Sequence, residues 1–451
     1  MLRLLLVSFI FFQAAWLRSP PSSPELAHRS TPLSSIDPSC KDFSDLEPLI
    51  GLIGDAHIAQ LGEISHGDGG AFLARTRLVK FLHERMGFDL LVFESGFFEC
   101  RDVAALLGSS MPLGDTLRRG VYPVWRLSAQ MQPLFEYIRE TASTARPLTL
   151  AGFDPQFSAA DSAQRIVEVI RPILAECRGK SRSEELRKRL DEVTEACSGA
   201  GAVKIDDSRH RLNEEMFMEL RRALTVPTLR FRATTSPHHR EWLGRVVENL
   251  AAMERSIHVR GKAPPFDPGR ISEYTRHPQV IHASNIRNRA MAENLAWLLE
   301  HTARGRKTIV WAANNHVAYK HKTTALSPLP GNNDKPAIEP AGLHHRRAVG
   351  ARVFTLLSIV HEGSWAAPTI RREDKYIWQS GEYPSSEPTS LAHALHELGL
   401  KHAVVDVRGL EQLFTERQSL FGDDPVRMDE FADAVLFFDT MIPSTPIRSN
   451  E

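Results

Sequence analysis

The 451-residue sequence lacks features that would assign it to several protein classes at once. It has no excess of charge, because 55 Lys and Arg residues balance 55 Asp and Glu residues. No overall field therefore steers the chain toward nucleic acid or an anionic membrane, and we expect no nucleic-acid partner. No apolar run reaches the ~20 residues needed to span a bilayer comfortably. The composition, 42% apolar and 24% charged, is that of an ordinary globular protein.

Cysteine is also scarce, with only Cys40, Cys100, Cys177 and Cys197 present. An even number permits disulfides in an oxidising compartment, in three possible pairings. Cys177 and Cys197 are close in sequence, but a helix over Ser183–Ala196 would hold them about 20 Å apart, beyond disulfide reach. Buried free thiols are the alternative.

Three common catalytic motifs are missing as well. The chain contains no G-x-S-x-G, no Walker A sequence and no H-E-x-x-H. These absences exclude a serine nucleophile elbow, a P-loop and a zincin-type metal site. The pairs His238-His239 and His344-His345 lie in polar stretches, so we expect them to be solvated rather than to bind a metal.

The N-terminus combines Arg3 with a short apolar run from Leu4 to Trp16, which is typical of a secretory signal peptide. We therefore expect residues 1–18 to direct export to the periplasm or the exterior, or to remain as an uncleaved anchor. Residues 19–40 are rich in Pro and Ser and are predicted to form a linker.

Seven short apolar runs followed by polar residues predict buried strands. Helical patterns separate most of them, which indicates an α/β fold with a mainly parallel sheet and helices on both faces. The predicted strands are Ile58–Gly62, Leu90–Phe93, Leu148–Gly152, Thr308–Ala312, Val353–Val360, Ala403–Val407 and Ala434–Phe438. The main predicted helices are Ala71–Met86, Met131–Thr141, Asn285–His301 and Ser390–Leu398.

The strand signal vanishes between residues 158 and 301, where the chain is helical and highly charged. We interpret this range as a helical insertion that divides the catalytic core into residues 41–157 and 302–451. The insertion could form a lid or one wall of the substrate cleft. The stretch Lys322–Pro340 is predicted to be a loop near the site.

Chemically capable residues follow several predicted strands, namely Glu63, His66, Glu94, Asp154 and His316. Because ligands bind beyond the carboxyl ends of parallel strands, these residues are expected to share one edge of the sheet. An imidazole beside a carboxylate can take a proton from water while the carboxylate fixes its tautomer. The alternative is that Glu63 and His66 only cap the helix that follows.

The position of Arg75 favours a functional site over the alternative that Glu63 and His66 only cap the helix. On a helical wheel it lies within the apolar stripe, whereas Arg77, Lys80 and Glu84 lie on the face assigned to solvent. An inward arginine is costly unless it is paired, and Glu63 and Glu94 are the expected partners. A purely structural ion pair is the alternative. The stripe consists of Ala71, Phe72, Leu78, Val79, Leu82 and Met86.

The chain resembles the erythromycin esterase family in Gly62-Glu63-x-x-His66-Gly67, in the arginine nine residues after that histidine, and in the strand leading to Glu94. Other matching segments are Gly152-Phe153-Asp154, Met291-Ala292-Glu293-Asn294, Trp311-Ala312-Ala313-Asn314-Asn315-His316 and Phe438-Asp439. The resemblance extends from about residue 45 to the C-terminus, with more distant similarity to TraB-type and ChaN-type domains.

The resemblance implies hydrolysis of an ester or lactone by an activated water, without a covalent serine intermediate. His66 would be the general base supported by Glu94, and Glu63 and Arg75 would shape and neutralise the site. His316 would contribute to catalysis or bind the carbonyl group. The residues predicted to bind substrate are Asp154, Arg287, Asn314 and Asn315.

Two departures from the family pattern bear on activity. The family commonly has a histidine where this chain has Ala313, and an aspartate where it has Asn288. Losing these groups could alter the substrate, reduce activity or remove a metal site. Since the family is broad, the resemblance does not by itself imply activity on macrolides.

Three hypotheses follow. The first is a hydrolase that needs no metal or other cofactor, acting on a small-molecule ester or lactone. The second is a metal-dependent hydrolase with Glu63, His66, Glu94 and His316 as ligands for Zn²⁺ or Mn²⁺. The third is a catalytically silent binding protein. The sequence predicts no oligomeric state.

Overall fold

The computed structural model describes residues 23–447 except 175, 177–179, 200–204, 227–230, 232–234, 321–336, 371–375 and 417–424. The predicted signal segment 1–18, Cys177 and most of the predicted loop Lys322–Pro340 therefore lie outside the described residues. Within the described part, no helix is both long and apolar enough to cross a membrane. Cys40, Cys100 and Cys197 are free thiols.

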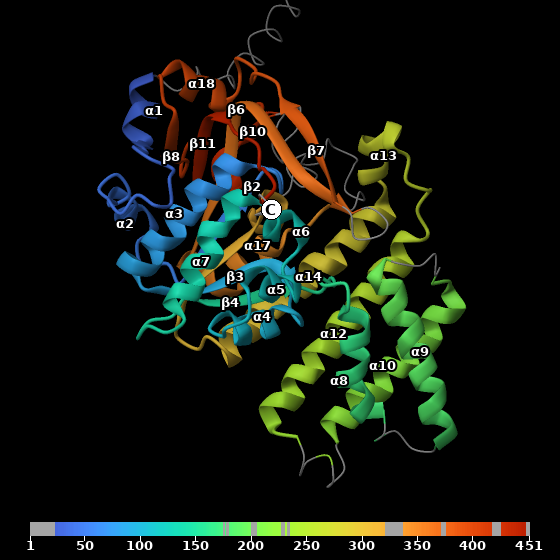
Figure 1. Ribbon diagram of the computed structural model, residues 1–451. Coiled ribbons are helices and arrows are strands. Elements are labelled where there is room, and N and C mark those ends of the chain that lie inside the picture. The colour runs from blue at the N-terminus through green and yellow to red at the C-terminus, as the bar shows by residue number, and fades with distance from the viewer. Residues whose placement is uncertain are drawn as a thin grey trace, which may run out of the picture.

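A nine-stranded, mostly parallel sheet forms the centre of the molecule (Figure 1). Its order is β1-β8-β11-β6-β2-β5-β3-β4, with β7 paired to β6, and only β1, β8 and β7 join antiparallel. The α/β prediction is confirmed. The bounds are β1 Ser30–Pro32, β2 Ile58–Glu63, β3 Phe88–Gly96, β4 Thr149–Asp154, β5 Lys307–Ala313, β6 Val353–Ile370, β7 Tyr376–Tyr383, β8 His402–Asp406 and β11 Ala434–Met441.

Alternate side chains of the central strands enter two separate cores, one on each face of the sheet. Val92 and Val310 belong to one core, and Phe93 and Trp311 belong to the other. Because both faces are buried, these strands consist of continuous apolar runs rather than alternating ones. This explains why seven strands could be recognised from the sequence.

Four helices overlap the predicted ranges, namely α3 (Gly69–Met86), α7 (Gln132–Thr141), α14 (Pro278–His301) and α18 (Leu391–Glu397), although α14 begins at Pro278 rather than at Asn285. Helix α17 (Ala341–Val349) was not predicted. Helix α3 stops at Gly87, which has a left-handed φ of 77° that favours glycine. Shorter helices are α1 (Ser23–Arg29), α2 (Pro48–Ile53), α4 (Cys100–Leu107), α5 (Leu113–Arg118), α6 (Pro123–Arg126) and α15 (Asn314–Val317).

A helical segment is inserted in the middle of the chain and forms a body beside the α/β core (Figure 1). Helix α14, which the sequence analysis assigned to this insertion, packs against both α12 and β4. It therefore belongs to the core as much as to the insertion, and it brings Arg287 to the sheet. The inserted helices are α8 (Ser162–Leu174), α9 (Lys180–Ser198), α10 (Asp207–Thr225), α12 (Pro237–Arg260) and α13 (Ile271–Thr275).

Two predictions about the N-terminal part are wrong. Residues 23–32 of the predicted linker form α1 and β1, and β1 pairs with the edge strand β8. Arg77, expected in solvent, is 1% exposed and binds Asp45 at 2.6 Å. The segment after β1 folds over this face of α3, so the carbonyl of Ser35 also accepts from Arg77. A helical wheel uses only the residues of one helix, so it cannot show that another segment of the chain will bury one of its faces.

The second half of the chain also departs from expectation. Strand β6 does not stop near Val360 but continues to Ile370, and its extension pairs with β7. We call this pair, residues 363–370 and 376–383, the hairpin arm. Most residues of β7 are half-buried or exposed, so this strand lacks the apolar run by which other strands were recognised. His345 is likewise not solvated: it is buried, and its Nδ1 lies 2.7 Å from Gln60 Oε1.

Candidate active site

A cavity of about 590 Å³ opens at the carboxyl edge of the central parallel strands. Glu63 is the last residue of β2, Ala313 the last of β5, and Glu94 lies two residues before the end of β3. The β3–β4 register shifts between Phe93 and Gly96, a type of irregularity that re-aims side chains beside active sites. The lining residues are Ile64, Ser65, His66, Glu94, Tyr122, Pro123, Val124, Trp125, Gln156, Arg287, Ala313, Asn314, Asn315, His316 and Pro368.

His66 enters the cavity from the loop between β2 and α3. Its Nδ1 lies 2.7 Å from Glu63 Oε1, and its Nε2 lies 4.0 Å from Glu94 Oε1. The ring packs edge-on against Trp125, yet the side chain remains 36% exposed. Thus Glu63, rather than the predicted Glu94, contacts and orients the imidazole, while Nε2 is directed toward the cavity.

The loop that carries His66 is held by the buried Asp68. The Asp68 carboxylate accepts from the Ser65 amide at 2.9 Å and from the Tyr383 hydroxyl at 2.8 Å. Burial is the main reason that the pKa of Asp68 is raised to about 7. Gly67 lies so close to the hairpin arm that a Cβ atom would come within 2.8 Å of the Ala366 backbone. The arm therefore helps to position the histidine.

Glu63 is fully buried and receives four hydrogen bonds. Besides His66, its donors are Arg75 at 2.6 Å, Trp311 at 2.8 Å and Trp125 at 3.2 Å. Burial alone would raise the pKa of Glu63, but the His66 hydrogen bond and the Arg75 charge together lower it. Glu63 is therefore ionised, and Arg75 is inward-facing and paired, as predicted, with one of its two expected partners.

The same carboxylate stabilises the charged form of His66. Burial opposes protonation, but the hydrogen bond to Glu63 and the negative charges of Glu94 and Glu63 raise the pKa of His66 to about 9. His66 is consequently a strong base once it has lost its proton, and an acid while it carries one.

Glu94 lines the cavity and is almost fully buried. Its Oε2 accepts from the Ala313 amide at 2.7 Å, and its Oε1 lies 3.1 Å from His316 Nε2 and 3.2 Å from Arg287 Nη2. Burial raises the pKa of Glu94, but the interactions with His316, His66 and Arg287 outweigh it and hold the pKa well below its usual range. Glu94 is therefore a fixed negative charge between two imidazoles.

Arg287 and Asp154 form a buried pair beside Glu94. Two guanidinium atoms of Arg287 bind the Asp154 carboxylate, at 2.5 and 3.1 Å. Asp154 is fully buried and does not line the cavity, whereas Arg287 does. Of the two, only Arg287 is placed to meet a substrate, and Asp154 holds it there.

The two asparagines before His316 differ in orientation. Asn314 is buried, and its amide group binds the main chain of Ser358 through both Nδ2 and Oδ1. Gly62 makes this approach possible, because a Cβ atom there would lie 2.4 Å from Asn314 Oδ1. Asn315 is exposed and lines the cavity. Asn314 also lines the cavity, but its amide group ties the start of α15 to β6, whereas the exposed Asn315 remains available to a ligand.

Comparison with known proteins places the chain in a family. A family model described as erythromycin esterase matches residues 83–439. The chain belongs to the erythromycin esterase family. The match contains Glu94, Asp154, Arg287 and His316, whereas the motif with Glu63, His66 and Arg75 precedes it.

Two curated relatives are similar in sequence. "Putative hydrolase YbfO" of Bacillus subtilis (strain 168) is 25% identical over 304 residues, which cover 65% of this chain and 62% of that protein. The erythromycin esterase type II of Escherichia coli is 22% identical over 382 residues, covering 82% of this chain and 85% of that protein.

A solved structure of the erythromycin esterase EreC, a mutant in its open conformation, shares the fold. Its TM-score is 0.65 at 16% identity, over 94% of this chain and 99% of that one. The similarity in fold thus covers nearly the whole of both chains.

Sequence reasoning missed several residues at the site. Trp125 and Trp311 donate to Glu63, Asn288 binds His316, and Tyr122 and Pro368 line the cavity. Asn288 was noticed only as a departure from the family pattern, and Trp311 only as part of a segment that matches the family, with no role assigned to it. These residues come from four segments distant in sequence, with Tyr122 and Trp125 in the same one, so no spacing rule could have grouped them.

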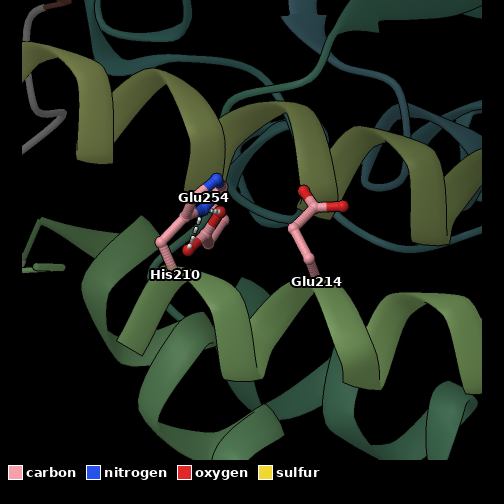
Figure 2. A group of neighbouring side chains, drawn as sticks. All are labelled: His210, Glu214 and Glu254. Carbon is pink, nitrogen blue, oxygen red and sulfur yellow. Dashed lines mark hydrogen bonds and ion pairs between the residues drawn. The ribbon is translucent and has the colours of Figure 1, made fainter. Parts of the chain in front are cut away.

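The four residues proposed as metal ligands do not form a preorganised group. Among the described residues, the one group whose ligand atoms lie within 4.8 Å of one another is His210, Glu214 and Glu254 in the insertion. Figure 2 shows His210 and Glu214 one turn apart on α10, with Glu254 opposite on α12. His210 binds Glu254 at 2.9 Å and Arg255 binds Glu214 at 3.1 Å, so these charges are already paired.

Proposed function

We propose that this protein hydrolyses an ester or lactone by attack of a water molecule, with no covalent intermediate. The observation that carries the proposal is the His66 imidazole, held at Nδ1 by a buried, ionised Glu63 and open to the cavity at Nε2. A histidine in this setting can remove a proton from water while the carboxylate stabilises the resulting imidazolium.

In the first step, neutral His66 accepts a proton from water at Nε2 as the water oxygen bonds to the substrate carbonyl carbon. The carbonyl π electrons move to oxygen and produce a tetrahedral oxyanion. The Arg287 guanidinium lines the cavity and supplies positive charge for this oxyanion. When the carbonyl re-forms, the bond to the leaving oxygen breaks and that oxygen takes up a proton.

The balance of charges in the site supports the role of His66 as the base that takes a proton from water. Glu63, Glu94 and Asp154 face the guanidinium groups of Arg75 and Arg287, so one positive charge is lacking when both imidazoles are neutral. A single imidazolium, at His66 or at His316, supplies that charge. The site therefore accommodates a proton on one of the two imidazoles, and water activation can place it on His66.

The donor set argues against the metal-dependent alternative. Both Glu63 oxygens accept from nitrogen donors, and the Arg287 guanidinium contacts Glu94 Oε1, the oxygen that also lies nearest His66 and His316. A divalent ion would have to compete with that guanidinium. Elemental analysis of the purified protein, with activity before and after chelation, tests this: a stoichiometric metal and loss of turnover would support the alternative.

Substitution of His66 by alanine tests the proposal. The expected result is a loss of at least about 10²-fold in turnover on the best substrate from a panel of esters and lactones, macrolides included. His282→Ala is the matched control, because His282 is exposed on α14 and does not line the cavity. Undiminished turnover by a folded His66→Ala variant would refute the mechanism. Ligand binding without turnover anywhere in the panel would indicate a binding protein.

A further inference from the structure

The tautomer of His316 is determined by a neighbouring amide. Asn288, 3% exposed on α14, donates from Nδ2 to the main-chain oxygen of Glu339 at 2.9 Å. Its Oδ1 therefore faces His316 Nδ1, at 2.7 Å. The opposite amide orientation would place two acceptors, Oδ1 and the Glu339 oxygen, against each other. Because an amide oxygen only accepts, His316 Nδ1 carries a hydrogen.

The other nitrogen of His316 has a partner in either protonation state. When Nε2 carries a proton, Glu94 Oε1 accepts it across 3.1 Å. When it does not, Arg287 Nη1 lies 3.4 Å away and can donate to it. An imidazole nitrogen with one acceptor and one donor beside it can give up a proton and later regain it without being left unpaired. His66 differs, because its Nε2 is 4.0 Å from Glu94 and directed into the cavity.

We propose that His316 is the general acid that protonates the leaving oxygen, and that Asn288 is the positioning residue that keeps its Nε2 available for this transfer. The inference rests on the proposed function and divides its two proton transfers between the two imidazoles. His66 removes a proton from water, and His316 Nε2 gives one to the departing alcohol oxygen as the acyl–oxygen bond breaks.

The proton balance closes over one cycle. Water supplies one proton to His66 and its hydroxide to the acyl carbon, while His316 supplies one proton to the alkoxide. The products are a carboxylic acid and an alcohol. His66 then releases its proton to solvent and His316 recovers one, with Arg287 donating to Nε2 in the interval. No oxidant, reductant or further reactant is required.

A neutral partner suits an acid of this kind. A carboxylate at position 288 would stabilise the imidazolium and weaken its tendency to release the proton. The Asn288 amide accepts the Nδ1 hydrogen without adding a negative charge. The groups that face His316 from other segments are Glu94 on β3 and Arg287 on α14, which oppose each other in sign.

The experiment compares two esters of the same acid, one with a p-nitrophenol leaving group and one with a simple alkyl alcohol. A p-nitrophenolate leaves without a proton, whereas an alkoxide needs one. Asn288→Ala and His316→Gln are therefore expected to lose at least about 10²-fold on the alkyl ester and less than about tenfold on the nitrophenyl ester. Equal losses on both esters would overturn the inference.

Asn285→Ala is the matched control. Asn285 lies nearly one turn earlier on α14 and binds the same segment, residues 337–339. It donates to the Ala337 carbonyl oxygen at 2.7 Å and accepts from the Glu339 amide at 2.8 Å. It should leave the ratio of the two rates unchanged. Asn288→Asp retains an acceptor for Nδ1, so it should recover part of the alkyl-ester activity that Asn288→Ala loses.

A nitrogen NMR spectrum of the imidazoles gives a readout that is independent of turnover. His316 Nδ1 should be protonated in the unchanged protein, and this preference should be lost in Asn288→Ala. A protonated Nδ1 that persists in the variant would contradict the positioning role. If the unchanged protein hydrolyses neither ester nor any lactone, the proposed function itself fails, and the acid role with it.

Discussion

Two networks of charged side chains in this protein use the same residue types in different surroundings. At the sheet edge, Arg75 and Glu63 are 1% and 0% exposed and bind at 2.6 Å. In the insertion, Arg221 and Glu248 bind at the same distance, but they are 33% and 39% exposed. Burial makes the first pair sensitive to loss of either partner, whereas water and salt screen the second.

The comparison teaches why ion pairs alone do not identify a site. Both regions contain Arg, Glu and His in contact, and the group most like a metal site, His210 with Glu214 and Glu254, lies in the insertion. Glu254 is as fully buried as Glu63, so burial of one charge does not by itself distinguish the sheet edge. At the sheet edge, several buried charges lie beside one cavity and contact an imidazole that lines it. The following predictions test that distinction.

The largest effect is expected from breaking the buried pair. Arg75→Met leaves Glu63 charged and without its guanidinium, and should lower the free energy of unfolding by about 3–5 kcal/mol. Arg221→Met, in the insertion, should change it by less than about 1 kcal/mol. Chemical denaturation of both variants measures the difference. Similar values would show that burial does not separate the two networks.

A double substitution sharpens the same test. Arg75→Met combined with Glu63→Leu removes both charges and should restore part of the stability lost in the single variant, because no unpaired charge remains buried. Turnover should stay low, since His66 has then lost its orienting carboxylate. A double variant with restored turnover would contradict the role given to Glu63.

The pH dependence of turnover follows from the pKa of His66. Since Glu63 and Glu94 raise that pKa to about 9, the neutral imidazole increases as the pH rises toward 9, and the rate on a nitrophenyl ester should rise with it. Glu63→Gln removes the main stabilising charge, so the rising limb should move to lower pH and the maximal rate should fall by about 10²-fold. A pH–rate profile that falls over this range would contradict the base role.

The same shift predicts a pH effect on stability. A folded-state pKa above the ordinary value of about 6.5 stabilises the fold below pH 6.5, and this contribution disappears as the pH rises through about 9. The unfolding free energy of the unchanged protein should therefore decline more across this interval than that of His66→Asn. Urea denaturation at several pH values checks the sign, and parallel curves would refute it.

The smallest effect is expected at the hairpin arm. Tyr383→Phe removes one donor from the buried Asp68 and should cost about 1–2 kcal/mol of stability. Turnover should fall only a few-fold, because the Ser65 amide still holds the Asp68 carboxylate. Tyr376→Phe, which removes a hydrogen bond to Arg126 farther along the arm, is the control. Equal turnover for the two variants would show that Asp68 does not position His66.

Much of the fold was predictable because it depends on local patterns. Strands β2, β3 and β5 are buried on both faces, and their continuous apolar runs stand out from the helices between them. Strand β7 was missed because most of its residues are half-buried or exposed and form no apolar run. The segment that covers Arg77 was missed because it is held by contacts with a distant helix rather than by its own periodicity.

The sequence predicted which residues form the site, but not which of them contact one another. Glu63, His66, Arg75 and Glu94 stand out because polar groups follow apolar strands and one arginine interrupts an apolar stripe. Their partners could not be assigned in the same way. The side chain on His66 Nδ1 is Glu63 rather than Glu94, and that difference depends on angles within a loop of three residues.

The sequence by itself determined the α/β class, the edge of the sheet where polar groups gather and the need to pair an inward arginine, because strand and helix periodicities are local properties. Only the tertiary structure decided which oxygen faces which nitrogen: Glu63 on His66, Glu94 between two imidazoles, and Asn288 on His316. Such contacts join residues as far apart as Glu94 and His316, 222 positions along the chain, and they exist only once the strands are paired.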